Sequence, residues 1–177
     1  AERAKVLIGM RAGSIDMKRA QCTDKGIQIR CARQEEYQAV EDIMQQVQDL
    51  HACWRPDIYK SAETVLPPDV FAQAVQEQTF YVAEYNGCIT GILFLLFRHV
   101  ESPSQVTRNI LFVDCMAVEA SYRGMGIGHA FFDFLKDMKE EKGYDSIELQ
   151  VNARNKAAYE MYKAYGFTEK SINMELL

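Results

Sequence analysis

A β-hairpin is predicted by residues 79–97. Two apolar runs, 79–85 and 88–97, flank Asn86 and Gly87, and an Asn-Gly pair suits a two-residue turn because both positions need positive φ. The second run is apolar at consecutive positions, a pattern typical of a central strand that is covered on both faces. The chain is therefore expected to place helices on both sides of one sheet.

The spacing of apolar residues predicts the other elements. Helices are expected over 40–50, 67–75, 127–143 and 155–165, and further strands over 27–32, 109–118, 146–151 and 167–177, with a polar loop over 99–108. Asn155 is predicted to cap the last helix, with Gly143 and Gly166 closing the last two helices. The order β-α-α-β-β-β-α-β-α-β predicts an α/β (α+β) fold with a mixed sheet flanked by helices on both faces.

The charge of the chain excludes one class of partner. Lys and Arg number 20 against 25 Asp and Glu, a net charge of −5, whereas nucleic-acid-binding proteins need clustered positive charge. The first 30 residues carry seven basic against three acidic side chains. Residues 1–25 are therefore interpreted as a basic N-terminal extension, either tag-derived or disordered. Residues 26–177 are interpreted as one domain, which suits a chain of 177 residues.

Neither a membrane span nor a metal site is expected. The apolar run 92–97 is far shorter than the ~20 residues that a membrane span needs. The five cysteines and three histidines are scattered without a C-x-x-C pair, which disfavours zinc ligation and a disulfide framework. Idle thiols of this kind are typical of a reducing compartment, and we expect a cytoplasmic protein.

A glycine-rich turn precedes the helix that begins at Ile127. Its glycines let the backbone approach a ligand, and free N–H groups at a helix N-terminus favour phosphate oxygens. The turn lacks the Gly-Lys-Ser/Thr of a P-loop. A dinucleotide fingerprint from Gly124 would need glycine where His129 stands, although Glu148 could act as its ribose-binding acid. A nucleotide-binding oxidoreductase therefore stays open as an alternative.

Two motifs resemble those of the GNAT N-acetyltransferase superfamily. Residues 123–128, Arg-Gly-Met-Gly-Ile-Gly, match its cofactor motif Q/R-x-x-G-x-G/A at each fixed position. Further along the chain, its pattern N-x-x-A-x-x-x-Y-x-x-x-G-F is met by Asn155, Ala158, Tyr162, Gly166 and Phe167. The resemblance covers roughly residues 27–177 and implies a small single-domain member with a mostly antiparallel central sheet.

The resemblance implies acetyl-CoA as the cosubstrate. In that family the backbone of the glycine turn holds the diphosphate, a role that falls here to Arg123, Gly124, Met125, Gly126, Ile127 and Gly128. The Arg123 side chain either adds charge or covers the helix end. The preceding strand bulges and diverges from its neighbour, which frees backbone groups of Met116, Ala117 and Val118 for the pantetheine arm and the acetyl carbonyl. Further cofactor contacts fall to Asn152, Asn155, Ala158 and Tyr162.

Two side chains are predicted to move protons. Tyr162 matches the acid that the family uses to protonate the departing thiolate; its alternative role is that of a core aromatic residue. Asp114 is the only acid in an apolar strand, where partial desolvation would raise its pKa toward that of a useful base. A water relay is the alternative base, with Glu84 and Glu148 in reserve.

Strand alternation places Asp114, Met116 and Val118 on one face of the sheet and Cys115 on the other. The resemblance implies direct acetyl transfer to a primary amine of a small molecule or peptide, bound among the first two helices and the 99–108 loop. A homodimer is consistent with the family. The competing interpretation is a non-catalytic acyl-CoA-binding sensor or regulatory module of the same fold, because a fold does not prove an activity.

Overall fold

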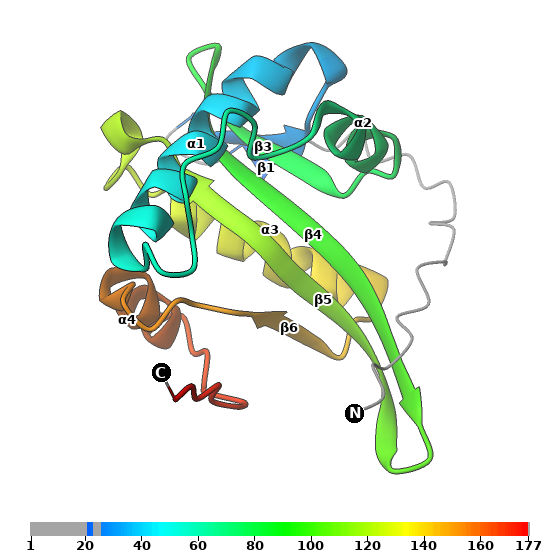
Figure 1. Cartoon of the computed structure of the whole chain (residues 1–177). Helices are drawn as coiled ribbons and strands as arrows, with labels where there is room; N and C mark the ends of the chain where they lie inside the picture. The colour runs from blue at the N-terminus through cyan, green and yellow to red at the C-terminus, as the bar shows by residue number, and fades with distance from the viewer. Residues whose placement is uncertain (1–20, 23–25, 177) are drawn as a thin grey trace.

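The described residues form one sheet of six strands, in the order β1-β2-β3-β4-β5-β6 (Figure 1). The computed structural model describes residues 21–22 and 26–176. Its strands are β1 (Gln21–Cys22), β2 (Gln28–Cys31), β3 (Phe80–Tyr85), β4 (Cys88–Ser102), β5 (Gln105–Val118) and β6 (Ser146–Leu149). Its α-helices are α1 (Tyr37–Trp54), α2 (Pro68–Gln76), α3 (Ile127–Lys142) and α4 (Lys156–Ala164), and its 3₁₀ turns are η1 (Gln34–Glu36) and η2 (Ala120–Tyr122).

The sheet is mixed and mostly antiparallel, as predicted. Strands β1 to β5 pair with their successive neighbours in antiparallel fashion, and β5 pairs with β6 in parallel. The predicted hairpin is confirmed, because Asn86 and Gly87 join β3 to β4 with φ values of 50° and 78°. Strand β4 lies inside the sheet, and its neighbouring residues Ile92 and Leu93 are both fully buried, one in each of the two core clusters.

Helices cover both faces of the sheet (Figure 1). The face covered by α3 and α4 packs Ile127, Phe131 and Leu135 against Leu93, Leu95 and Leu111. The opposite face packs Val40 and Ile43 of α1 and Phe71 of α2 against Phe80, Val82 and Ile92. This three-layer arrangement follows from the continuous apolar pattern of the central strands, since both of their faces need a cover.

The predicted polar loop 99–108 is wrong. Strand β4 continues to Ser102 and β5 starts at Gln105, so a long two-stranded arm projects past the helices (Figure 1, bottom). Ser102 pairs with Gln105 at its tip. The arm is largely exposed, and a ribbon in water on both faces needs no alternation of apolar residues. Its polar composition therefore looked like a loop.

The predicted last strand, 167–177, is also wrong. Residues 167–176 join no strand, and Leu177 lies outside the described residues. The polar side chains of this segment contact other parts of the chain instead: Lys170 bonds Glu148 at 2.7 Å, and Glu175 pairs with Arg55. The sequence of a segment thus does not identify the strand with which it would pair.

Strand β1 lies within residues 1–25, the predicted N-terminal extension, and pairs with β2 of the predicted domain. Residues 1–20 and 23–25 of that predicted extension lie outside the described residues. At the other edge of the sheet, β6 ends at Leu149, earlier than the predicted 146–151.

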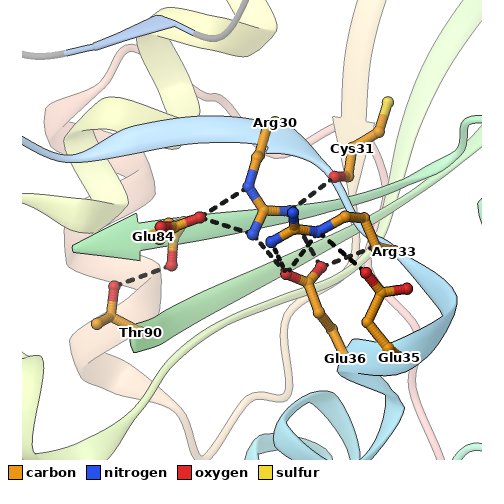
Figure 2. Close-up of polar contacts among 8 residues, drawn as sticks. Arg30, Cys31, Arg33, Glu35, Glu36, Glu84 and Thr90 are labelled. Carbon is orange, nitrogen blue, oxygen red and sulfur yellow. Dashed lines mark hydrogen bonds and ion pairs between the residues drawn. The ribbon is translucent and has the colours of Figure 1, made fainter. Parts of the chain in front are cut away.

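A charged cluster joins β2, β3 and η1 (Figure 2). The Arg30 guanidinium donates to Glu84 at 2.8 Å and to Glu36 at 3.0 Å, and Glu36 also accepts the backbone N–H of Arg33 at 2.8 Å. The side chains of Arg30 and Glu36 are only 16% and 10% exposed. Removal of either charge therefore leaves the other with fewer ionic partners in a poorly hydrated position.

Replacing Arg30 by methionine is expected to lower the free energy of unfolding by about 2 kcal/mol, between the values for exposed and buried ion pairs. Burial works against ionisation of Glu36, but its hydrogen bonds from Arg30 and Arg33 prevail and lower its pKa. This stabilisation is present above the ordinary glutamate pKa and is lost as the pH falls through the lowered one. Urea titrations at neutral and acid pH should show the variant's deficit shrinking in acid.

The matched control is Arg33→Met, because Arg33 contacts the same carboxylate with a side chain that is 59% exposed. Its deficit at neutral pH should stay below about 1 kcal/mol. Equal deficits for the two variants would contradict a special role for Arg30.

Candidate active site

A β-bulge in β5 holds Asp114. Cys115 pairs with Phe94 and Val113 pairs with Leu95, so Asp114 is the extra residue of β5. The bulge shifts the alternation: Val113 and Met116 both lie on the α3 face, whereas Cys115 lies on the α1 face. The strict alternation behind the predicted common face of Asp114, Met116 and Val118 therefore fails at the bulge, while Met116 and Val118 do share the α3 face.

Beyond this bulge β5 leaves β6. The last pair between them is Val113 with Leu149, but β5 continues to Val118 paired with β4 alone. The N–H of Glu119 donates to Thr90 of β4 at 2.9 Å, so by alternation the N–H and C=O of Val118 and Met116 point away from β4. Consistently, the Val118 carbonyl accepts a bond from Arg123 Nε at 3.3 Å. The expected divergence is confirmed, and the expected bulge is present but lies at Asp114, ahead of residues 116–118.

The divergence of β5 from β6 leaves an opening in the sheet, where the two strands no longer pair. The glycine turn follows β5 and presents free N–H groups at this end of the strand. Gly124 and Gly126 have φ of 79° and 94°, a conformation that favours glycine. Within the described part of the chain, the N–H groups of residues 124–128 donate no hydrogen bond. Helix α3 begins at Ile127, so its N-terminal dipole adds partial positive charge. These features suit the two phosphates of a diphosphate.

Helix α4 places Tyr162 on the α3 side of the opening. Its ring packs edge-on against Phe132 at 5.8 Å and against Phe167 at 5.9 Å. Burial and the Cys115 thiol raise the pKa of Tyr162 to about 12. This pKa keeps the hydroxyl protonated at neutral pH, and because it forms no hydrogen bond with the described residues, it is free to donate.

The predicted cofactor contacts of α4 lie at its start. Asn155 is the N-cap, as predicted, and its carboxamide oxygen accepts the Ala158 N–H at 3.2 Å. The Asn152 oxygen accepts the N–H of Arg154 at 2.9 Å. Both side chains thus order the segment between β6 and α4, and their carboxamide N–H groups are unpaired among the described residues.

Asp114 is the acid nearest the divergence of β5 from β6. It is exposed, but the side chains around its carboxyl displace part of its hydration and raise its pKa, while the Arg98 charge opposes this. The two reserve bases are engaged in ion pairs: Glu84 with Arg30, and Glu148 with Lys170. Of these three candidate bases, Asp114 is the one without an ion pair among the described residues.

An open cleft of about 360 Å³ lies between α1 and η2. It is lined by Gln46, Asp49, Leu50, Ala120 and Arg123. Among these residues only Arg123 was predicted to belong to the site. The polar residues of α1 have the spacing of any solvated helix face, so the sequence does not mark them as site residues.

The sequence profile of the acetyltransferase (GNAT) family matches residues 44–167, a stretch that includes both predicted motifs. The chain belongs to the GNAT acetyltransferase family. A nucleotide-binding oxidoreductase of the doubly wound type is excluded, since its sheet would be mostly parallel.

Relatives of this GNAT chain carry acetyltransferase names. An uncharacterized N-acetyltransferase of Methanocaldococcus jannaschii is 30% identical over 96 residues, covering 54% of this chain and 42% of the relative. The [ribosomal protein bS18]-alanine N-acetyltransferase of Escherichia coli K12 is 37% identical over 57 residues, covering 32% and 38%. The matched stretch thus spans less than half the length of these two curated relatives.

Solved structures share the fold. A mutant of the BH1408 protein of Bacillus halodurans superposes with a TM-score of 0.80 at 27% identity, covering 84% of this chain and 98% of that one. The aminoglycoside N-acetyltransferase AAC(6')-Iy, solved in complex with CoA, gives a TM-score of 0.63 at 15% identity, covering 85% and 93%. At this identity the second likeness supports the fold alone.

Two other kinds of site are missing from the part of this GNAT chain that the structure describes. None of its helices is long and apolar enough to cross a membrane. The described His, Cys, Asp and Glu residues form no group of three or more that could hold a metal ion.

Proposed function

We propose that this protein is an acetyl-CoA-dependent N-acetyltransferase that acts on a primary amine by direct attack. The observation that carries the proposal is the opening where β5 leaves β6, which ends at the free N–H groups of residues 124–128. A diphosphate fits this turn, and the backbone N–H groups of Met116 and Val118, which point away from β4, fit an extended amide-bearing arm. Acetyl-CoA supplies the activated acetyl group when bound.

Each reaction step has a candidate group in this chain. As the amine nitrogen bonds to the acetyl carbon, backbone N–H groups at Met116 and Val118 stabilise the developing oxyanion. Asp114, directly or through water, takes the proton that the amine loses. The carbon–sulfur bond then breaks, and Tyr162 donates its proton to the departing sulfur. Its raised pKa keeps this proton in place at neutral pH.

The direct test is acetylation of amines by the purified chain. Acetyl-CoA is mixed with a panel of polyamines, aminoglycosides, amino acids and peptides with free N-termini, and released thiol and product mass are measured. A peptide N-terminus belongs in the panel because one relative is named as a ribosomal-protein alanine N-acetyltransferase. Acetyl-CoA binding with no acetylated amine in any class would favour the sensor interpretation instead.

Replacing Asp114 by asparagine is expected to remove the acidic limb of the pH profile of kcat/KM. Desolvation raises the pKa of Asp114, so this limb in the wild type should lie above the ordinary aspartate range. At neutral pH kcat/KM should fall about fivefold, because water can take over part of the proton transfer. Initial rates from pH 5 to 9 measure both effects, and an unchanged acidic limb would remove Asp114 as the base.

The same variant should not melt below the wild type at neutral pH. A raised pKa means that the fold favours protonated Asp114, so its ionised form opposes folding above the ordinary aspartate pKa. Asparagine removes this opposition. A loss of activity together with a lower Tm would indicate structural damage and not a lost base.

A further inference from the structure

The Gln46 side chain joins α1 to the segment that leads into the glycine turn. Its carboxamide oxygen accepts the backbone N–H of Ala120 at 3.1 Å, and its Nε2 approaches Glu119 Oε1 at 3.4 Å. The Glu119 carboxylate in turn accepts the N–H of Ser121 at 2.8 Å, which caps η2. One glutamine thus bonds both to the first residue of η2 and to its N-cap.

The glycine turn needs this support because its own backbone makes few hydrogen bonds. At its start, the N–H of Arg123 reaches the Ala120 carbonyl only at 3.5 Å, and the next donors to bond within the described residues come after Gly128. At its end, Ile127 is 1% exposed and anchors the start of α3. The position of residues 124–126 is therefore fixed from two sides, by Ile127 and by η2.

The core contacts of α1 do not depend on Gln46. Val40 and Ile43 bury α1 against the sheet, and the Cys115 thiol contacts the Met44 sulfur at 3.6 Å. Gln46 also lines the cleft between α1 and η2, so it lies at the edge of the packed layer and outside its interior. Loss of the Gln46 hydrogen bonds should therefore affect the position of η2 and leave that of α1 unchanged.

We propose that Gln46, through Ala120 and Glu119, is a positioning residue for the turn that holds the cofactor diphosphate. This inference rests on the proposed function, since it requires that residues 124–128 bind acetyl-CoA. Loss of Gln46 lets η2 shift and spreads the free N–H groups over several orientations. The cofactor then orders the turn as it binds, which weakens binding and leaves the chemical step intact.

The test begins with calorimetric titration of wild-type protein with acetyl-CoA, followed by steady-state kinetics. In Gln46→Ala, Kd and KM for acetyl-CoA are expected to rise about fivefold, as for one lost hydrogen bond of ordinary strength, with kcat within about twofold. The control is Gln48→Ala, which removes a similar bond from the same helix to the Lys60 carbonyl. It should leave the cofactor Kd unchanged.

A swap of donor and acceptor separates positioning from direct contact with the phosphates. Gln46→Glu places a carboxylate against Glu119 and should raise Kd more than the alanine variant. In Gln46→Glu combined with Glu119→Gln, the amide at 119 donates to the carboxylate at 46, and Kd should return to within about threefold of wild type. A charge next to a bound phosphate would not be rescued in this way.

Three results decide the matter. A raised Kd in Gln46→Ala with rescue by the swap supports the proposal. An unchanged Kd in Gln46→Ala, or a swap without rescue, overturns it while the proposed function stands. Wild-type protein that does not bind acetyl-CoA overturns both.

Discussion

Replacing Tyr162 by phenylalanine is expected to lower kcat by at least about tenfold, toward the 100-fold typical of a lost general acid. The Kd for acetyl-CoA should change little, because the ring keeps its contacts with Phe132 and Phe167. A pKa of about 12 means that Tyr162 carries its proton across the working pH range. Single-turnover rates and calorimetric titration of the variant measure the two quantities separately.

The matched control is Tyr165→Phe. Tyr165 lies just past the end of α4, packs with its ring tilted against Phe132 at 4.2 Å, and also has a pKa raised to about 12. Its hydroxyl is buried without a partner among the described residues, so its removal should not lower kcat. Equal kcat for wild type and Tyr162→Phe would return Tyr162 to the role of a core aromatic residue.

Local signals account for much of the fold. The Asn86–Gly87 turn, the Asn155 cap and the end of α3 at Gly143, with φ of 69°, all follow the predictions. Each depends on a few adjacent residues, whose backbone preferences are the same in any fold. The helices and central strands follow for a similar reason, since their apolar spacing records which side is buried.

Features that depend on distant partners could not be predicted. The bulge at Asp114 exists because β4 and β5 run out of register at Phe94 and Leu95; neither strand alone encodes that offset, and only the family resemblance led us to expect a bulge in this strand. The segment after Phe167 was predicted as a strand but has no strand partner among the described residues. Gln46 carried no signal, because its role depends on a turn more than 70 residues away.

Replacing Gly126 by alanine is expected to raise the Kd for acetyl-CoA about 20-fold. Gly126 caps α3 with φ of 94°, and a side chain in this left-handed region costs about 1–2 kcal/mol. In the alanine variant the turn is expected to relieve this strain by rotating the peptide groups on both sides of residue 126. Those peptide groups carry N–H donors proposed to hold the diphosphate, so relief of strain and cofactor binding oppose each other. Calorimetric titration with acetyl-CoA and with CoA measures the loss.

The neighbouring variant Gly128→Ala separates strain from bulk. Gly128 lies inside the first turn of α3, and an added Cβ would meet only the Met161 sulfur, at an ordinary 3.5 Å. Because alanine favours a helix more than glycine does, this variant should melt no lower than wild type and keep Kd within about threefold. If both alanines weakened binding equally, crowding of the cofactor would explain the loss. If neither did, the diphosphate would have to bind elsewhere than at this turn.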